Sequence, residues 1–167
     1  MSEMKKVLEN KERVIYEGKP KYDAYLLQMI IGSIILGVVL GVAGWFFFKI
    51  TLWSVFIGIL ALILGIILGH LYYSKLYYAI TDKRIIIQSG IIGTDFKSID
   101  YDQIQNISLD VGIIGVMMHV GTIKIFTGEL MGGGKSVQPK YDEIKFIPTP
   151  YEIMKKLQTN LSKRKER

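Results

Sequence analysis

The sequence predicts an α-helical membrane hairpin followed by a mainly β, α+β domain of antiparallel strands that ends in a helix. Two observations predict this fold class. From Leu26 to Tyr73 the only ionisable side chains are those of Lys49 and His70, and Lys49 lies near the middle. From Leu76 onward the pattern changes to short β-branched and aromatic runs separated by glycines and charged residues, and the chain closes on an amphipathic helix.

The two halves of the apolar stretch, Leu26–Phe48 and Ile50–Tyr73, are each long enough for a membrane-spanning helix. About 20 apolar residues in a helix cross a hydrocarbon layer of ~30 Å. The alternative is a pair of buried helices in a soluble protein, but such helices are usually shorter and the rest of this chain is too small to cover both. Because the turn around Lys49 is very short, we expect an antiparallel hairpin with both termini on one side.

Basic residues near the helix ends predict which side faces the cytoplasm. The turn offers only Lys49, whereas the opposite ends are flanked by Lys6, Lys11, Arg13, Lys19, Lys21, Lys75, Lys83 and Arg84. By the positive-inside tendency, we expect a multi-pass protein of the cell membrane with both termini and the following domain in the cytoplasm. Aromatic residues gather at both ends, as in interfacial belts: Trp45, Phe46, Phe47, Phe48 and Trp53 at the outer one, and Tyr22, Tyr25, Tyr72 and Tyr73 at the inner one.

Glycines within the hairpin indicate close helix packing. The pairs Gly37/Gly41 and Gly65/Gly69 have the spacing that lets two helix backbones approach each other. This spacing serves either packing inside the hairpin or association of several copies. A conduction pathway is not favoured, because neither span contains an Asp, Glu or Arg.

Composition excludes several kinds of chemistry. The chain has no Cys and only two His, so disulfides and thiolate metal sites are excluded and a histidine metal site lacks evident partners. The glycine-rich stretch before Ser136 has Glu129 where a phosphate loop requires glycine. We find no catalytic constellation, and we expect no enzyme activity, cofactor or metal.

The charge distribution argues against nucleic-acid binding. Residues 74–150 carry eight basic and eight acidic residues, so the folded part is neutral. The excess of positive charge lies in the C-terminal region, including the basic tail at 164–167. A nucleic-acid-binding domain normally carries a basic face.

The order of elements can be predicted from local patterns. A short strand or helix is expected near Arg13–Glu17, and strands at 76–81, 84–89, 95–100, 103–110, 120–127 and 145–147. Asn106 suggests a bulge or a late start of the fourth of these. Val111–Met118 is expected to be either a loop over the core or a short strand, and Gly128–Lys140 a flexible loop.

A helix is expected at the C-terminal end. Thr149 suits the N-cap, Pro150 the first helical position, and Glu152 the capping box. The residues that follow form one apolar stripe: Ile153, Met154, Leu157 and Leu161.

Four stretches together carry a resemblance to a known family: Tyr78–Ile86, Gly90, Tyr101–Ile107 and Val120–Thr127. They resemble the prokaryotic pleckstrin-homology-like domain over about residues 75–160, with a weaker likeness at 13–20. In that family a two-helix membrane anchor commonly precedes the domain. The resemblance implies a partly open barrel of two antiparallel sheets, closed at one end by the C-terminal helix, and it does not imply an enzyme.

The expected organisation follows from this resemblance and from the hairpin. Residues 1–25 would form an N-terminal segment, 26–73 the hairpin, 74–163 the pleckstrin-homology-like domain and 164–167 the tail. The leading hypothesis is a non-enzymatic membrane protein whose domain is a scaffold for protein interaction, through a homo-oligomer or a membrane protein partner. A domain that binds a lipid or small ligand at the barrel mouth or through the 128–140 loop is the alternative, and a small transporter or channel subunit comes third.

Two sets of residues are candidate sites. The apolar segment after the fourth strand is a candidate interaction surface, either dipping into the bilayer or receiving a partner: Val111, Ile113, Ile114, Val116, Met117 and Met118. Lys83 and Arg84, in the first hairpin of the domain, are candidate headgroup contacts, because eukaryotic relatives of the fold bind phosphoinositides there. Asp82 and the neutral domain body argue against phosphoinositide binding itself.

Overall fold

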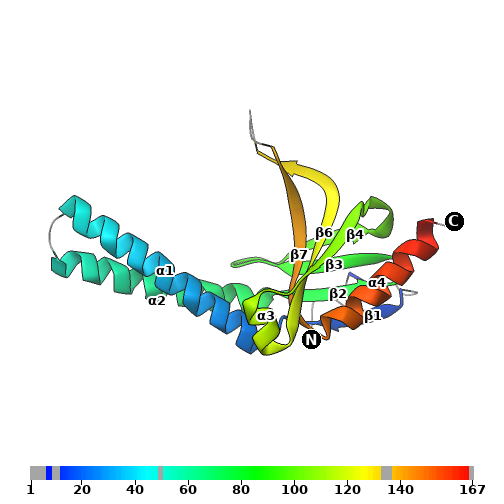
Figure 1. Cartoon of the computed structure of the whole chain (residues 1–167), viewed down its shortest axis with the longest axis horizontal. Coiled ribbons are helices and arrows are strands. Elements are labelled where there is room, and N and C mark those ends of the chain that lie inside the picture. Colours follow the sequence, from blue (N-terminus) through cyan, green and yellow to red (C-terminus); the bar gives the residue numbers. More distant parts are fainter. Residues whose placement is uncertain (1–6, 9–11, 49–50, 133–136, 166–167) are drawn as a thin grey trace.

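The structure is a computed structural model that describes residues 7–8, 12–48, 51–132 and 137–165 (Figure 1). Two long helices, α1 (Tyr22–Phe48) and α2 (Thr51–Lys75), project from one side of a domain that is built from two antiparallel sheets and a C-terminal helix. The predicted fold class is therefore confirmed. The predicted turn residue Lys49 and the last tail residues, 166–167, lie outside the described part of the chain.

The helices α1 and α2 have the length and composition of membrane spans. Their apolar parts, Tyr22–Phe46 and Leu52–Lys75, contain 25 and 24 residues. Only 11% and 6% of the most apolar stretch of each helix is buried, so most of the apolar side chains face outward. This exposure distinguishes them from the core helices of a soluble protein.

The inner faces of the two helices meet through small residues. A Cβ atom added to Gly37 would lie 2.9 Å from the carbonyl oxygen of Gly58, and one added to Gly65 would lie 2.7 Å from the Ser33 hydroxyl. Ser33 and Ser54 are themselves buried between the helices. The glycine spacing thus serves packing inside the hairpin, one of the two uses that the sequence left open.

The first sheet includes a strand that precedes the hairpin. It has the order β1 (Val14–Gly18), β2 (Tyr77–Thr81), β3 (Arg84–Ser89) and β4 (Asp95–Asp100). Gly18 pairs with Tyr78, and Tyr16 with Ile80, so the hairpin is inserted between two neighbouring strands of one sheet. The folded unit accordingly extends into the N-terminal segment, where the sequence predicted a short strand or helix.

The second sheet has the order β5 (Asn106–Asp110), β6 (Val120–Met131) and β7 (Gln138–Pro148). The late start at Asn106 is confirmed, because a short 3₁₀ helix, η2 (Tyr101–Gln103), comes before it. The flexible loop predicted over residues 128–140 is wrong at its two ends, because 128–131 belong to β6 and 138–140 to β7, with Met131 paired to Gln138. Residues 133–136 of this prediction lie outside the described part of the chain. Glycines conceal the strand pattern here, and Gly128, at φ 90°, lies where the register shifts.

The predictions for Val111–Met118, a loop or a strand, are also wrong, since the structure contains a short helix there, α3 (Ile113–Met118). Gly112 stands at its N-cap. His119 ends it in the left-handed conformation (φ 55°) and donates its backbone N–H to the carbonyl of Gly115. A helix of six residues is too short to reveal a 3.6-residue period, which explains why the sequence pattern did not show it.

The core lies between the sheets and beneath the helix α4 (Pro150–Lys165). The predicted stripe on α4 is confirmed: Ile153 and Leu157 are buried, and Met154 and Leu161 pack at the edge. The carbonyl of Thr149 accepts the N–H groups of Glu152 and Ile153 at 3.1 and 3.3 Å. Isoleucines dominate the interior: Ile80, Ile85, Ile99, Ile123, Ile125, Ile144 and Ile147.

Candidate functional site

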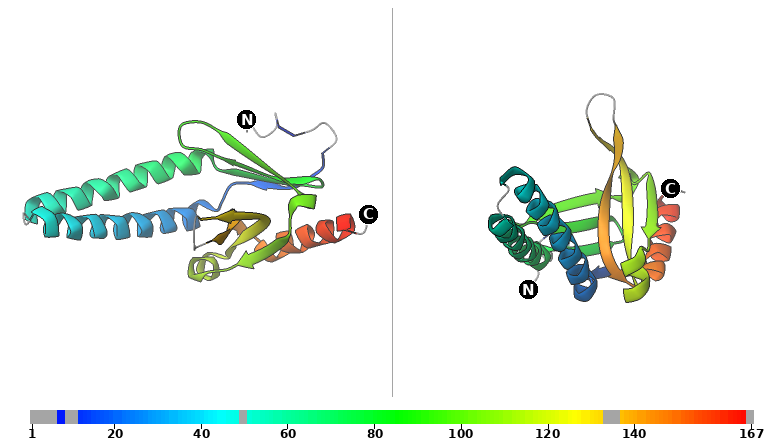
Figure 2. Two further views of the ribbon diagram at one scale, coloured as in Figure 1. Left: turned by 90° about the horizontal axis from the view of Figure 1, so that it is seen from above. Right: turned by 60° about the vertical axis from the view of Figure 1, so that its left-hand side comes forward.

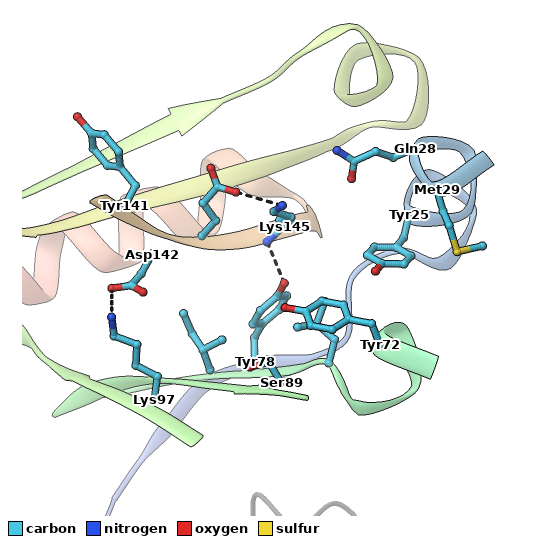
Figure 3. Close-up of a pocket in the computed structure, with 13 residues that line it drawn as sticks. Tyr25, Gln28, Met29, Tyr72, Tyr78, Ser89, Lys97, Tyr141, Asp142 and Lys145 are labelled. Atoms are coloured by element: carbon cyan, nitrogen blue, oxygen red, sulfur yellow. Dashed lines mark hydrogen bonds and ion pairs between the residues drawn. The ribbon is translucent and has the colours of Figure 1, made fainter. Parts of the chain in front are cut away.

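A cavity of about 490 Å³ lies where the hairpin meets the two sheets (Figure 3). Its walls come from three parts of the chain. The helices provide Tyr25, Gln28, Met29 and Tyr72; the first sheet and the residue before it provide Leu76, Tyr78, Ile87, Ser89 and Lys97; and β7 provides Tyr141, Asp142, Glu143 and Lys145. The cavity therefore lies between the two sheets at the end of the domain where the helical hairpin begins and ends.

Tyr78 contributes a buried phenol group to the cavity. Its ring is buried in the core, and its hydroxyl oxygen accepts the backbone N–H of Lys145 at 3.2 Å, which links β2 to β7 across the barrel. Burial raises the pKa of Tyr78 well above its usual range. The residue is thus a neutral phenol whose position is fixed by both sheets.

Paired charges line part of the cavity. Lys97 on β4 contacts Asp142 on β7 at 2.8 Å, and Lys145 contacts Glu143 at 3.2 Å. The amino group of Lys97 also lies 3.6 Å from Glu129. Each cation has an anion beside it, so the lining carries both signs of charge in balance.

Glu129 lies between two lysines at the edge of this charged group. It accepts a hydrogen bond from Lys140 at 2.7 Å, and this bond and the charge of Lys97 lower the pKa of its carboxyl group. Sequence reasoning assigned this stretch to a flexible loop. In the structure its strand residues bring a carboxylate to the edge of the cavity.

Tyrosines at the inner ends of the helices form the remaining wall. Tyr25 and Tyr72 line the cavity, and the ring of Tyr25 lies 5.1 Å from that of Tyr73. The Tyr73 hydroxyl donates to the carbonyl of Pro20 at 3.0 Å, and Lys19 donates to the carbonyl of Ser74 at the same distance. These contacts join the segment just before α1 to the end of α2.

The predicted headgroup contacts, Lys83 and Arg84, lie at the opposite end of β2 from the hairpin. The Arg84 guanidinium holds the carboxylate of Glu12 by two hydrogen bonds of 3.1 and 3.2 Å and also donates to the carbonyl of Val7. The Glu12 side chain is fully buried. Arg84 therefore attaches the N-terminal segment to the sheet, and its contact with lipid stays a prediction.

The predicted interaction surface divides into two faces of α3. Ile114 and Met118 pack against Ala24 and Phe146, and Val111 is partly buried. The outer face is exposed and consists of Ile113, Val116 and Met117. Whether this face binds a partner stays a prediction.

Within the described ranges, no group of three or more His, Asp or Glu side chains has the arrangement of a metal site. The cavity offers instead phenol rings, a thioether, and ammonium and carboxylate groups in pairs. Such a lining suits a ligand with an apolar part and charges of both signs.

Comparison with known proteins identifies the fold family. A family model described as bacterial PH (pleckstrin-homology) domain matches residues 24–165. The chain belongs to the bacterial PH domain family. The predicted family resemblance is thereby confirmed, and β1 lies before the matched region although it completes the first PH-domain sheet.

Two further comparisons concern curated proteins and solved structures. No curated protein matches the chain. Among solved structures, the chain is similar to a DUF1696 family protein with a pleckstrin-homology domain from Shewanella loihica, at 19% identity and a TM-score of 0.38. The match covers 53% of this chain and 73% of that one.

Proposed function

We propose that this bacterial PH domain protein is anchored in a membrane by its helical hairpin and binds a zwitterionic lipid headgroup in the cavity between the two sheets. The observation that carries the proposal is the position of the cavity, whose wall is formed by the inner ends of two apolar helices. In a membrane-spanning hairpin these ends lie at the level of the headgroups.

The exposed surface of the hairpin supports the membrane anchor. Large apolar side chains point outward along both helices, including Val42 at 62% and Leu52 at 83% exposure. A monomeric soluble protein rarely leaves an apolar surface of this extent in contact with water. The basic residues near the inner helix ends, Lys19, Lys21 and Lys75, favour the orientation in which the domain faces the cytoplasm.

The charge balance of the cavity favours a zwitterionic headgroup over a phosphoinositide. A phosphate can contact Lys97 or Lys145, while a ligand ammonium takes the place of the lysine beside Asp142 or Glu143. A polyphosphorylated ring would instead place several negative charges next to these two carboxylates. Ammonium and phosphate in one molecule match both signs, and Tyr25 and Tyr72 offer aromatic surface to the glycerol region.

Binding can be tested with the full-length protein in detergent. Mass spectrometry of the intact protein would count retained phosphatidylethanolamine, and titration with soluble phosphoethanolamine would show whether the headgroup alone suffices. Asp142→Asn removes one side of the charge pair and should weaken lipid binding by about tenfold, which corresponds to about 1.4 kcal/mol. Lys155→Met, on the exposed face of α4, is the matched control and should retain the lipid.

Three outcomes decide the proposal. Loss of lipid in Asp142→Asn but not in Lys155→Met would support it, and binding of the soluble headgroup would place recognition in the polar cavity. Equal lipid retention by both variants would contradict it. Preferential retention of polyanionic lipids would favour a phosphoinositide-type site instead.

A different observation favours the scaffold or self-assembly hypothesis. A shallow apolar groove of about 480 Å³ runs along the hairpin surface beside Gly37, Gly41 and Gly58. Small residues in such a groove permit the approach of a helix from a second copy. Light scattering with detergent correction on the full chain tests this, and a monomer would exclude it. The full chain is needed because a fragment that begins at 74 lacks β1.

A further inference from the structure

We infer that the PH domain lies against the bilayer and inserts three apolar tips into its surface around the base of the hairpin. This inference rests on the proposed membrane anchor but not on the proposed ligand. The three tips are defined by described residues only: Ile91 and Ile92 in the β3–β4 turn, Ile113, Val116 and Met117 on the outer face of α3, and Leu130, Met131 and Val137 toward the far end of the β6–β7 hairpin. Each presents aliphatic or Met side chains that the fold leaves uncovered.

The exposure of these side chains is high. Ile92, in the β3–β4 turn, is 97% exposed, and Ile113 on α3 is 83% exposed. The remaining members of the tips are also exposed: Ile91, Val116, Met117, Leu130, Met131 and Val137. These residues carry no charge, and their positions are separate in the sequence.

All three tips lie on the side of the domain from which the hairpin leaves. Figure 1 and the left view of Figure 2 share their horizontal axis, and along this axis the three tips lie at about the same position as the inner ends of α1 and α2. The helix α4 and the C-terminal end point to the opposite side. A membrane that contains the hairpin therefore meets the tips and leaves α4 in water.

Specific contacts fix α3 at this level. Lys21, directly before α1, donates from its side chain to the carbonyl of Met118 and from its backbone to the carbonyl of Phe146. Ile114 and Met118 pack near Ala24, in the first turn of α1. The exposed face of α3 is thus held where the helix enters the bilayer.

The distribution of the tips favours a lipid surface over a protein partner. In the left view of Figure 2, the β3–β4 turn lies on one side of the hairpin base, and α3 and the β6–β7 tip lie on the other. A flat surface crossed by the hairpin contacts both at once, whereas a globular partner would have to surround the helices. The same arrangement holds the cavity mouth at the headgroup level, next to Tyr25 and Tyr72.

Single-cysteine labelling provides a direct test, because the natural chain contains no Cys. Ile92→Cys, Met117→Cys and Met131→Cys are prepared in the full chain, labelled with an environment-sensitive fluorophore and reconstituted into phospholipid vesicles. Lipids with a nitroxide near the glycerol region should quench most of the fluorescence at all three positions. Gln158→Cys, on the exposed face of α4, should lose little fluorescence.

Leu60→Cys, on the exposed surface of α2, separates failure of this inference from failure of the membrane anchor. Lipids with a nitroxide at the acyl-chain centre should quench it. Quenching at 60 without quenching at the tips would overturn the inference and leave the anchor intact. Absence of quenching at 60 would overturn the anchor as well. Tips shielded from a water-soluble quencher but not quenched by lipid would indicate a protein partner and contradict the inference.

Discussion

The helices of the hairpin meet through residues with little or no side chain, whereas the sheets of the domain meet through isoleucines. Gly37 and Gly58 bring two backbones into contact in the hairpin. In the domain, Ile85 and Ile123 fill the space between sheets and are completely buried. The two regions are thus packed by opposite means within one continuous chain.

The proposed location of the hairpin in a membrane accounts for this difference. Lipid is as apolar as the side chains of a membrane helix, so burying those side chains gives little driving force, and close van der Waals packing becomes decisive. In water, removal of apolar surface is itself the driving force. A larger side chain at the helix–helix contact should therefore destabilise the hairpin, and a smaller side chain in the core should destabilise the domain.

The largest effect is expected at an ion pair in the domain, which Arg84 forms with Glu12. Arg84→Met removes the guanidinium group from the buried Glu12 carboxylate and should lower the free energy of unfolding by about 3–5 kcal/mol. Guanidinium unfolding of the full chain in detergent, followed by circular dichroism, measures this change.

The double variant Glu12→Leu/Arg84→Met is the control for this pair. Because it buries no unpaired charge, it should be more stable than Arg84→Met alone. If both variants lost the same stability, the ion pair would not be what attaches the N-terminal segment to the sheet.

Removal of volume from the domain core should have the next largest effect. Leu157 on α4 is completely buried, so Leu157→Ala leaves a cavity and should cost about 2–5 kcal/mol of unfolding free energy. Gln158→Ala, at the neighbouring exposed position, should change stability little. The same circular-dichroism titration compares the two, and similar midpoints would show that α4 is not part of the cooperative core.

Local patterns were sufficient to predict most elements of the fold. Strands β3 and β4 were predicted with the bounds that the structure shows, and the stripe of α4 was predicted residue by residue. In each case the signal lies within one short window of sequence. The short helix α3, the end of β6 and the start of β7 were not predicted, because α3 is too short to show a period and the two strand ends lack a regular alternation of polar and apolar residues.

The site could not be predicted because its members come from separate elements. Lys97 pairs with Ile87 in one sheet and Asp142 with Ile125 in the other, and only the packing of the sheets brings the two charges together. Arg84 and Glu12 are 72 positions apart, with the hairpin between them. No local sequence pattern indicates a contact between residues so far apart in the chain.

Added volume in the hairpin should have a smaller but distinct effect. A Cβ on Gly58 would lie 3.0 Å from the carbonyl oxygen of Gly37, so Gly58→Leu should destabilise the hairpin by about 1–3 kcal/mol. Both Trp residues of the chain, Trp45 and Trp53, lie in the hairpin, so their fluorescence during SDS titration reports this region specifically.

Gly32→Leu is the matched control, because nothing lies within 4 Å of a Cβ at that position. It should leave the hairpin unchanged or stabilise it, since leucine favours a helix more than glycine does. Equal destabilisation by the two variants would mean that the hairpin is not packed through the Gly37–Gly58 contact.

The smallest effect is expected at the cavity, where Tyr78→Phe removes the acceptor of the Lys145 N–H group. The loss of this hydrogen bond should cost about 1 kcal/mol near neutral pH. Tyr151→Phe, on an exposed side chain, is the control and should have little effect. Unfolding of the full chain at neutral pH compares the three proteins.

The pH dependence makes this last prediction specific. Because burial raises the pKa of Tyr78, the unfolded chain loses the phenol proton first when the pH rises above about 10. The native state then binds more protons than the unfolded state, so stability falls with pH, by at most ~1.4 kcal/mol per pH unit from this group. Tyr78→Phe should show a shallower alkaline decline than the native chain. Equal slopes would mean that the Tyr78 hydroxyl ionises freely in the folded protein, and the cavity would then be open to water at this hydroxyl.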